Sequence, residues 1–333
     1  MKFIESIRNG LDSLLGNYPE VVLYGEDLID PYGGAFKVTK GLSTKYPDRV
    51  WNTPISEAAI IGMSAGMAMC KMKPIVEIMF GDFTSLGVDQ LLNHLTKYAW
   101  MYNNQVETPV TIRTAMGGRR GYGPTHSQSL EALLSTIPGL SIIAPSHYHD
   151  PGRILQQAVL EDSSVKVFSE YKLLYPQELQ TPNTVKSGLT LDVSSDVYPI
   201  AHLSNCEFDN PEILIISYGG NALLLEQVLL DLLIEYELSA QCALPARIKP
   251  FDPLQIQHLI SEAQVVLVVE ESPKCHGWGA EVVATLSEAG LLSGKNVFRI
   301  GSAETPIPSS MAQEEQVLPS AAQIMETISQ ILV

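Results

Sequence analysis

Apolar positions along the first half of the chain follow two alternating periods. Short runs rich in β-branched residues are bounded by Gly, Pro or Asp, as is typical of buried strands, and the segments between them place apolar residues at helical spacing. The expected strands are 21–24, 75–80, 109–113, 141–144 and 165–169, and the expected helices are 58–70, 88–102, 127–137 and 150–160. This alternation predicts an α/β domain with a mostly parallel sheet, whose ligands bind beyond the carboxyl ends of the strands.

A change of pattern divides the chain after this domain. Pro, Ser, Asn, Thr and Asp replace the periodic apolar runs, and further on the alternation resumes with expected strands at 213–218, 265–270 and 297–300 and helices at 222–236, 279–288 and 320–332. The sequence therefore predicts a first domain over 1–178, a linker over 179–211, and a second, smaller α/β domain over 212–333.

Composition and charge narrow the class of partner. The chain has 333 residues, 45% of them hydrophobic and 17% charged, and a formal net charge of -16. This suits a globular protein, and it argues against a nucleic-acid or anionic-membrane surface, which would need a basic patch. Residues 1–10 have no apolar core of signal-peptide length, and the longest apolar run, 58–70, is too short to span a bilayer. We therefore expect a cytoplasmic protein whose partners are small molecules or proteins.

Metal-binding patterns are weak in this sequence. Cys70, Cys206, Cys242 and Cys275 include no Cys-x-x-Cys pair, so reduced structural thiols are expected. His147-x-His149 has no acidic or cysteine partner at ligand spacing nearby, which favours a solvated loop over a metal site. A Gly-x-Ser-x-Gly elbow, a Walker phosphate loop and a His-Glu-x-x-His motif are also missing.

One carboxylate stands at the start of a buried helix. Thr53 can cap this helix and Pro54 suits its first position, which would place Glu57 in the first turn. A Glu in that place can simply complement the helix dipole. The position alone therefore leaves a chemical role for Glu57 open.

Two further features lie where an α/β sheet presents ligand-contacting groups. Phe80 and Phe83 follow an expected strand, and aromatic residues there can equally be core. His126 follows the loop containing Arg119 and Arg120, so it is either a capping residue or a proton carrier near a mobile lid. The two arginines form either a solvated loop tip or an attractor for an anionic substrate, a 2-oxo carboxylate or a sugar phosphate.

Taken together with neighbouring motifs, these residues resemble the beta subunit of the thiamine-diphosphate-dependent 2-oxoacid dehydrogenases of the pyruvate and branched-chain type, a family in the transketolase superfamily. The resemblance runs in order from about residue 21 to 175 and continues more weakly beyond. Its motifs are Gly25-Glu26-Asp27, 33–42, 53–57, 80–83, Asp89-Gln90, 126–129, 138–140, 217–219, Glu270-Glu271, 277–281 and 305–308.

The resemblance implies a pyrimidine-binding domain, a transketolase-type carboxyl-terminal domain and thiamine diphosphate as cofactor. It gives Glu57 the role of the carboxyl group that hydrogen-bonds N1′ of the aminopyrimidine and holds its imino tautomer. Phe83 matches the aromatic residue that stacks on the pyrimidine ring, and Met79 and Phe80 would line the same pocket. His126 matches the histidine that reaches the substrate.

The resemblance also implies a partner. The Gly-Asp-Gly stretch with a later Asn, which binds Mg²⁺ and the diphosphate in these enzymes, is missing here, so the Mg²⁺ is expected on a separate alpha subunit in an α2β2 heterotetramer. An acyltransferase or carrier protein would dock as a further partner. Relatives carry a K⁺-binding loop with Asn-Pro before the strand expected at 165–169, and Ser163-Ser164 at those positions leaves the K⁺ site open.

The implied reaction is decarboxylation of a 2-oxo acid and transfer of the acyl unit to a lipoyl or other carrier thiol. One alternative is transketolase-like transfer of a two-carbon ketol unit from a ketose phosphate to a carrier protein. Another is a non-catalytic scaffold subunit, against which the joint presence of Glu57, Phe83 and His126 argues.

Overall fold

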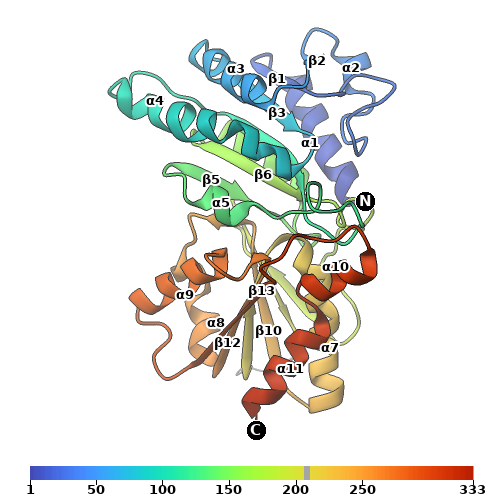
Figure 1. The fold of residues 1–333 in the computed structure, drawn as a ribbon, viewed down its shortest axis with the longest axis vertical. Coiled ribbons are helices and arrows are strands. Elements are labelled where there is room, and N and C mark those ends of the chain that lie inside the picture. The colour runs from blue at the N-terminus through green and yellow to red at the C-terminus, as the bar shows by residue number, and fades with distance from the viewer. Residues whose placement is uncertain (206–210, 333) are drawn as a thin grey trace. The chain divides into compact units, whose positions relative to one another are not determined.

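The computed structural model describes residues 1–205 and 211–332, which form two compact units (Figure 1). The first unit contains Met1–Met116, Leu133–Ile143 and Asp150–Leu179. The second contains Gly117–Ala132, Ala144–His149 and the chain from Gln180 onward. Two short segments, Gly117–Ala132 and Ala144–His149, therefore belong to the second unit, although the chain before and after each of them belongs to the first.

The first unit is built on a parallel sheet. Its strands follow the order β5-β6-β4-β3-β1-β2, and each neighbouring pair is parallel. Nearly all residues of these strands are buried, as expected when both faces of a parallel sheet are covered. The strands are β1 (Val21–Gly25), β2 (Val50–Asn52), β3 (Lys73–Ile78), β4 (Thr111–Met116), β5 (Leu140–Ile143) and β6 (Val165–Tyr171).

Helices connect these strands. They are α1 (Phe3–Asn17), α2 (Leu42–Lys45), α3 (Glu57–Met69), α4 (Thr96–Met101), α5 (Glu131–Ser135) and α6 (Pro151–Leu160), with a 3₁₀ segment η1 (Gly81–Gly87) and a π-helical segment η2 (Gln90–Leu95). Helices α1 and α6 approach closely, because a Cβ atom on Gly152 would lie 2.0 Å from the Ser6 carbonyl oxygen. Only glycine fits at that crossing.

Most elements expected in the first half are present, and three details differ. Residues 127–130 are not helical, and 88–102 is η2 followed by α4 rather than one α-helix. The prediction that Thr53 caps α3 is wrong, because its N–H donates to the Gly25 carbonyl oxygen at 2.9 Å and the helix begins at Glu57. The backbone at Thr53 thus continues the pairing of β2 with β1.

The second unit has a mixed sheet in the order β13-β12-β9-β10-β8-β7. The β10–β8 and β8–β7 pairs are antiparallel, and the other pairs are parallel. Figure 1 shows α8 and α9 on one side of this sheet and α7 and α11 on the other. The apolar faces of α7 and α11 share one buried cluster with the strands. The strands are β7 (Thr190–Val193), β8 (Ile200–Ser204), β9 (Ile213–Ile216), β10 (Ala240–Pro245), β12 (Val265–Pro273) and β13 (Asn296–Ser302).

The connecting elements of the second unit are mostly helical. They are η3 (Gly219–Asn221), α7 (Ala222–Tyr236), the short strand β11 (Arg247–Lys249), η4 (Pro253–Ile256), α8 (Gln257–Glu262), α9 (Trp278–Glu288), α10 (Met311–Val317) and α11 (Ala321–Leu332). In the part of the chain that the structure describes, no helix is both long and apolar enough to cross a bilayer.

The segment expected as a linker contains structure instead. Strands β7 and β8 lie within 179–211 and pair as the last two strands of the second sheet. In β7 only Leu191 is buried, while Thr190 and Asp192 are exposed. An edge strand that places polar side chains in water has the composition of a loop, which explains why the sequence pattern missed it.

Candidate active site

Two carboxyl groups lie at the carboxyl edge of the first sheet. Glu26 directly follows β1, and Glu57 is the first residue of α3. Only 4% of Glu26 and 6% of Glu57 is exposed. The Glu26 Oε1 atom has no hydrogen-bond partner among the described residues, and the Ser56 N–H donates to this carboxyl group. A buried acceptor without a partner is costly, so this atom marks a place where another polar group is needed.

The electrostatics of the two carboxyl groups are coupled. Burial, and to a smaller extent the charges of Glu57 and Asp27, raise the pKa of Glu26 to about 7, while the hydrogen bond from the Ser56 N–H acts in the opposite direction. Near neutral pH, Glu26 therefore carries a proton in a large fraction of molecules. The sequence assigned no role to Glu26. Two signals were available: its position directly after a buried strand and its place in the Gly25-Glu26-Asp27 motif.

Aromatic side chains lie on the segment that follows β3 and packs against α3. Phe80 and Phe83 are half-buried, with ring centroids 6.0 Å apart in an edge-to-face arrangement, and Phe36 lies 5.5 Å from Phe80. The Phe83 N–H donates to the Phe80 carbonyl oxygen at 3.0 Å, which fixes the turn between them. The Lys172 ammonium nitrogen lies 5.5 Å from the centre of the Phe80 ring. Met79, also half-buried, directly follows β3.

The 3₁₀ segment η1, which contains Phe83, packs closely against the start of α3. A Cβ atom on Gly87 would lie 2.3 Å from Ile61 Cδ1 and 3.7 Å from the Glu57 carbonyl oxygen. This glycine therefore permits the close approach of η1 to α3. The first unit thus brings together the predicted residues Glu57, Met79, Phe80 and Phe83 on neighbouring segments.

A buried ion cluster supports the sheet beneath this edge. The Arg113 guanidinium group lies 2.7 Å from Glu77 Oε2 and 2.7 Å from Glu170 Oε1, so one side chain on β4 joins carboxylates on β3 and β6. The Tyr175 hydroxyl donates to Glu170 Oε2 at 3.0 Å. Arg113 is 1% exposed, so its charge is compensated almost entirely by these partners.

The remaining predicted site residues belong to the second unit. His126 is half-buried, and its Nδ1 atom lies 3.0 Å from Thr125 Oγ1. Arg120 is exposed, with its guanidinium carbon 5.4 Å from the centre of the Tyr122 ring. The roles of His126 and Arg120 stay predictions.

Two glutamates of the second unit hold the loop around Arg119. The Gly118 N–H donates to Glu271 Oε1 at 2.6 Å, while the N–H groups of Arg119 and Gly121 donate to the two Glu314 oxygens at 2.7 and 2.8 Å. The Arg119 Nη2 atom donates to the carbonyl oxygen of Pro319. In this arrangement the Arg119 side chain bonds to its own unit, and a substrate role for it stays a prediction.

His147 and His149 are both buried, so the expected solvated loop is wrong. Burial lowers the pKa of His149 to about 4, and the Ser146 N–H donates to its Nδ1 atom at 3.0 Å. His147 Nε2 lies 3.6 Å from Glu226 Oε2, and the Tyr148 hydroxyl donates to the same oxygen at 3.0 Å. The loop is buried within the second unit because Tyr148, between the two histidines, belongs to that unit's apolar core.

Glu226 is the anionic centre of that buried loop. Burial alone would raise its pKa, but hydrogen bonds from His147, Lys186 and Tyr148 lower the pKa to about 2. The Lys186 ammonium group lies 2.8 Å from Glu226 Oε1. Within 1–205 and 211–332, no group of three or more His, Cys, Asp or Glu side chains could hold a metal ion.

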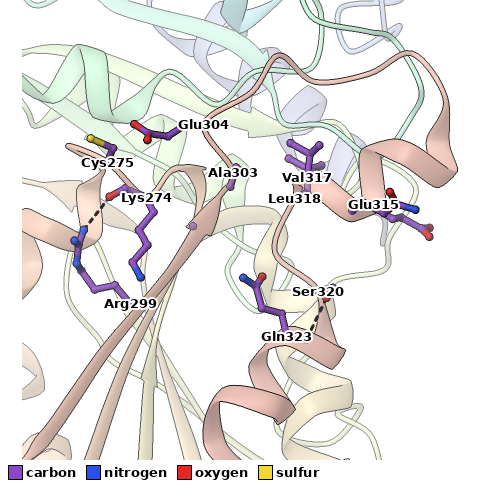
Figure 2. Close-up of a pocket in the computed structure, with 13 residues that line it drawn as sticks. Lys274, Cys275, Arg299, Ala303, Glu304, Glu315, Val317, Leu318, Ser320 and Gln323 are labelled. Carbon is purple, nitrogen blue, oxygen red and sulfur yellow. Dashed lines mark hydrogen bonds between the residues drawn. The ribbon is translucent and has the colours of Figure 1, made fainter. Parts of the chain in front are cut away.

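An open pocket of about 740 Å³ lies elsewhere in the second unit. Figure 2 shows Lys274 and Arg299 on one side of it and Ser320 and Gln323 at the start of α11 on another. The Arg299 Nη1 atom donates to the Lys274 carbonyl oxygen at 2.9 Å. The pocket is lined by none of the predicted catalytic or cofactor-binding residues.

Comparison with known families covers both units. The transketolase pyrimidine-binding domain matches residues 1–178, and the transketolase C-terminal domain matches residues 205–324. The beta subunit of acetoin:2,6-dichlorophenolindophenol oxidoreductase from Cupriavidus necator is 31% identical, over 96% of this chain and 94% of that protein. The pyruvate dehydrogenase E1 component subunit beta from Leifsonia xyli is 29% identical, over 100% of this chain and 95% of that protein. The chain belongs to the family of 2-oxoacid dehydrogenase beta subunits.

Family membership confirms the predicted family, the two-domain α/β fold of transketolase type and the dependence on thiamine diphosphate. The mitochondrial beta-1 subunit of the pyruvate dehydrogenase E1 component from Arabidopsis thaliana is another such relative, 31% identical over 96% of this chain and 86% of that protein. Among solved structures, the inactive beta4 tetramer of a split-gene transketolase has a TM-score of 0.73, covering 99% of this chain and 98% of that chain. At 18% identity it shows the shared fold.

The residues of this beta subunit fit the aminopyrimidine half of the cofactor. Glu57 offers a buried carboxyl group, and the adjacent Glu26 has a buried oxygen without a protein partner in the described residues. Phe80 and Phe83 add two half-buried aromatic rings on the segment that packs against α3. The donor set is therefore suited to a polar aromatic heterocycle.

Proposed function

We propose that this chain is the beta subunit of a two-subunit enzyme that decarboxylates a 2-oxo acid and transfers the acyl unit to a lipoyl or other carrier thiol. The observation that carries the proposal is the pair of buried carboxyl groups, Glu26 and Glu57, at the carboxyl edge of the first sheet, where η1 packs against the start of α3. A scaffold would gain nothing from two buried carboxyl groups, one of which lacks a partner for its Oε1 atom among the described residues.

Each of these side chains has a definite task in the proposed site. Thiamine diphosphate, when bound, supplies the carbon nucleophile and the electron sink that decarboxylation requires. With the cofactor bound, Glu57 would hold a proton at N1′ of the aminopyrimidine ring, Phe83 would supply the ring that stacks on it, and Met79 and Phe80 would line the same pocket. Because Glu26 is protonated in a large fraction of molecules near neutral pH, it does not place a full second negative charge beside Glu57.

His126 would act on the substrate side as a proton carrier. Its ring is half-buried and its Nδ1 atom lies within hydrogen-bond distance of Thr125 Oγ1, which favours one ring orientation. Arg119 and Arg120 would favour an anionic substrate near the same loop.

An alpha subunit would complete the enzyme as an α2β2 heterotetramer. We assign the Mg²⁺ and the diphosphate-binding residues to that subunit, since the chain lacks the Gly-Asp-Gly stretch that binds them. The names of the relatives, each a subunit beta, support this division of labour. An acyltransferase or carrier protein would be the further partner.

The reaction is tested with the two subunits purified together. Release of carbon dioxide from pyruvate and branched 2-oxo acids is measured beside cleavage of acetoin and consumption of xylulose 5-phosphate. We expect turnover of a 2-oxo acid. Turnover of the ketose phosphate alone would instead establish the transketolase-like reaction, and turnover of none of them by a cofactor-loaded complex would favour a scaffold.

The role of Glu57 is tested by Glu57→Gln. This substitution keeps the size of the side chain but replaces the carboxyl group with an amide, which cannot exchange a proton with the cofactor. We expect turnover to fall by about 10²–10⁴-fold while the subunits still assemble. The matched control is Glu107→Gln, an exposed position that should leave turnover unchanged. Full activity of Glu57→Gln would refute the assigned role.

A cytoplasmic location belongs to the same proposal. Cys70, Cys242 and Cys275 are free thiols, whereas Cys206 lies outside the described residues. Free thiols are typical of a reducing compartment. Cell fractionation with an antibody against the chain tests the location, and recovery in a membrane or secreted fraction would contradict it.

A further inference from the structure

Two lysine side chains reach the loop where relatives are expected to bind K⁺. This loop joins α6 to β6 and carries Ser163-Ser164 in place of Asn-Pro. Lys166 Nζ donates to the Asp162 carbonyl oxygen at 2.6 Å, and Lys73 Nζ donates to the Leu160 carbonyl oxygen at 3.1 Å. Leu160 is the last residue of α6, where helical carbonyl groups lack partners within the helix, and Asp162 lies two residues further on.

Lys166 is placed deep in the first unit. Its side chain is fully buried, and its backbone pairs in β6 between β4 and β5. The Asp162 carboxylate supplies the counter-charge and is itself held by the Ser164 N–H at 2.8 Å.

An ammonium group and a K⁺ ion serve such a loop in similar ways. Both carry one positive charge, and both satisfy carbonyl oxygens, the ion by replacing its hydration shell and the ammonium by three N–H donors. They cannot share the same oxygens here, because Lys166 Nζ is already at hydrogen-bond distance from the Asp162 oxygen. A second cation would also face two ammonium groups in a medium of low dielectric constant.

We propose that the Lys166 ammonium group, with Lys73 beside it, takes the place of a bound K⁺ ion at the α6–β6 loop of this chain. The residues present therefore do not fit a K⁺ site, and the loop keeps its conformation at any concentration of monovalent cation. The proposal concerns the fold of the first unit, and it holds whether or not the chain decarboxylates a 2-oxo acid.

The first test uses the unmodified full chain. Binding of an ion to the folded state alone raises Tm in proportion to the logarithm of its concentration, whereas a covalently attached ammonium group gives no such dependence. We expect the Tm in KCl to equal the Tm in choline chloride at each matched ionic strength. A Tm that rises selectively with KCl would overturn the proposal.

Variants at Lys166 provide the second test. Lys166→Met fills the same volume but leaves the Asp162 carbonyl oxygen without its donor, and we expect Tm to fall by roughly 3–8 °C. The matched control is Lys295→Met, because Lys295 Nζ donates to the Ala263 carbonyl oxygen at 2.5 Å from a half-buried position. Its loss of Tm should be smaller. A Lys166→Met variant as stable as the unmodified chain would overturn the proposal.

Lys166→Ala opens space at the same carbonyl groups. We expect the Tm of this variant to rise with KCl relative to choline chloride, since the ion can now enter where the ammonium group was. If the unmodified chain responds to KCl as strongly as Lys166→Ala does, the ammonium group does not replace the ion. All three tests of this proposal measure Tm, whereas the decarboxylase proposal is tested by turnover. Failure of one proposal is therefore distinguishable from failure of the other.

Discussion

Replacing Glu26 with Gln should stabilise the chain at alkaline pH and leave it unchanged at acid pH. Burial and the Glu57 and Asp27 charges raise the pKa of Glu26 from 4.5 to about 7 in the folded protein. Folding therefore favours the protonated carboxyl group. That contribution to stability is fully present below the unfolded-state pKa of 4.5 and is lost as the pH rises through about 7.

The pKa difference gives the size of the effect. At about 1.4 kcal/mol per unit of pKa, the raised value corresponds to roughly 3 kcal/mol at most, and local relaxation around the carboxylate leaves about 1–3 kcal/mol. Gln can still accept the hydrogen bond from the Ser56 N–H and never ionises. At pH 4, below the unfolded-state pKa, the unmodified chain and Glu26→Gln should therefore unfold at the same temperature, and at pH 8.5 the variant should unfold about 3–8 °C higher.

The assay is thermal unfolding of the cofactor-free chain at several pH values between 4 and 8.5. Glu107→Gln, at an exposed position, is the control and should track the unmodified chain throughout. A Glu26→Gln difference that is constant across this range would refute the reasoning, because it would show that ionisation of Glu26 costs no more in the folded state than in the unfolded one.

The buried ion cluster and the loop around residue 119 give two more predictions. Arg113→Met leaves the Glu77 and Glu170 carboxyl groups buried without their cation, and should cost about 3–5 kcal/mol of unfolding free energy in urea denaturation. The triple variant that also changes both glutamates to Gln should recover most of that loss, and no recovery would contradict the ion-pair account. Glu314→Ala removes the acceptor of two loop amides in 117–121, so their hydrogen exchange should speed up by about tenfold or more. Unchanged exchange there would show that other contacts hold the loop.

The sequence alone determined the fold class, the family and the place of Glu57 in the first turn of α3. These features depend on local patterns: the spacing of apolar residues, the position of Gly and Pro, and short motifs in a fixed order. Helix α7 begins and ends at Ala222 and Tyr236, as its apolar spacing predicts. Where the pattern is strong and local, propensity and packing favour the same structure.

The tertiary structure decided what depends on residues far apart in the chain. The raised pKa of Glu26 depends on Glu57, which lies on a different element, and burial of His147 depends on the core that Tyr148 joins. Strand β7 depends on pairing with β8, since its own residues have the composition of a loop. Likewise, Lys166 is an ordinary charged residue in the sequence, and the ammonium group gains its place at the Asp162 carbonyl oxygen because β6 carries it into the interior. Desolvation and pairing act through space, so no local pattern records them.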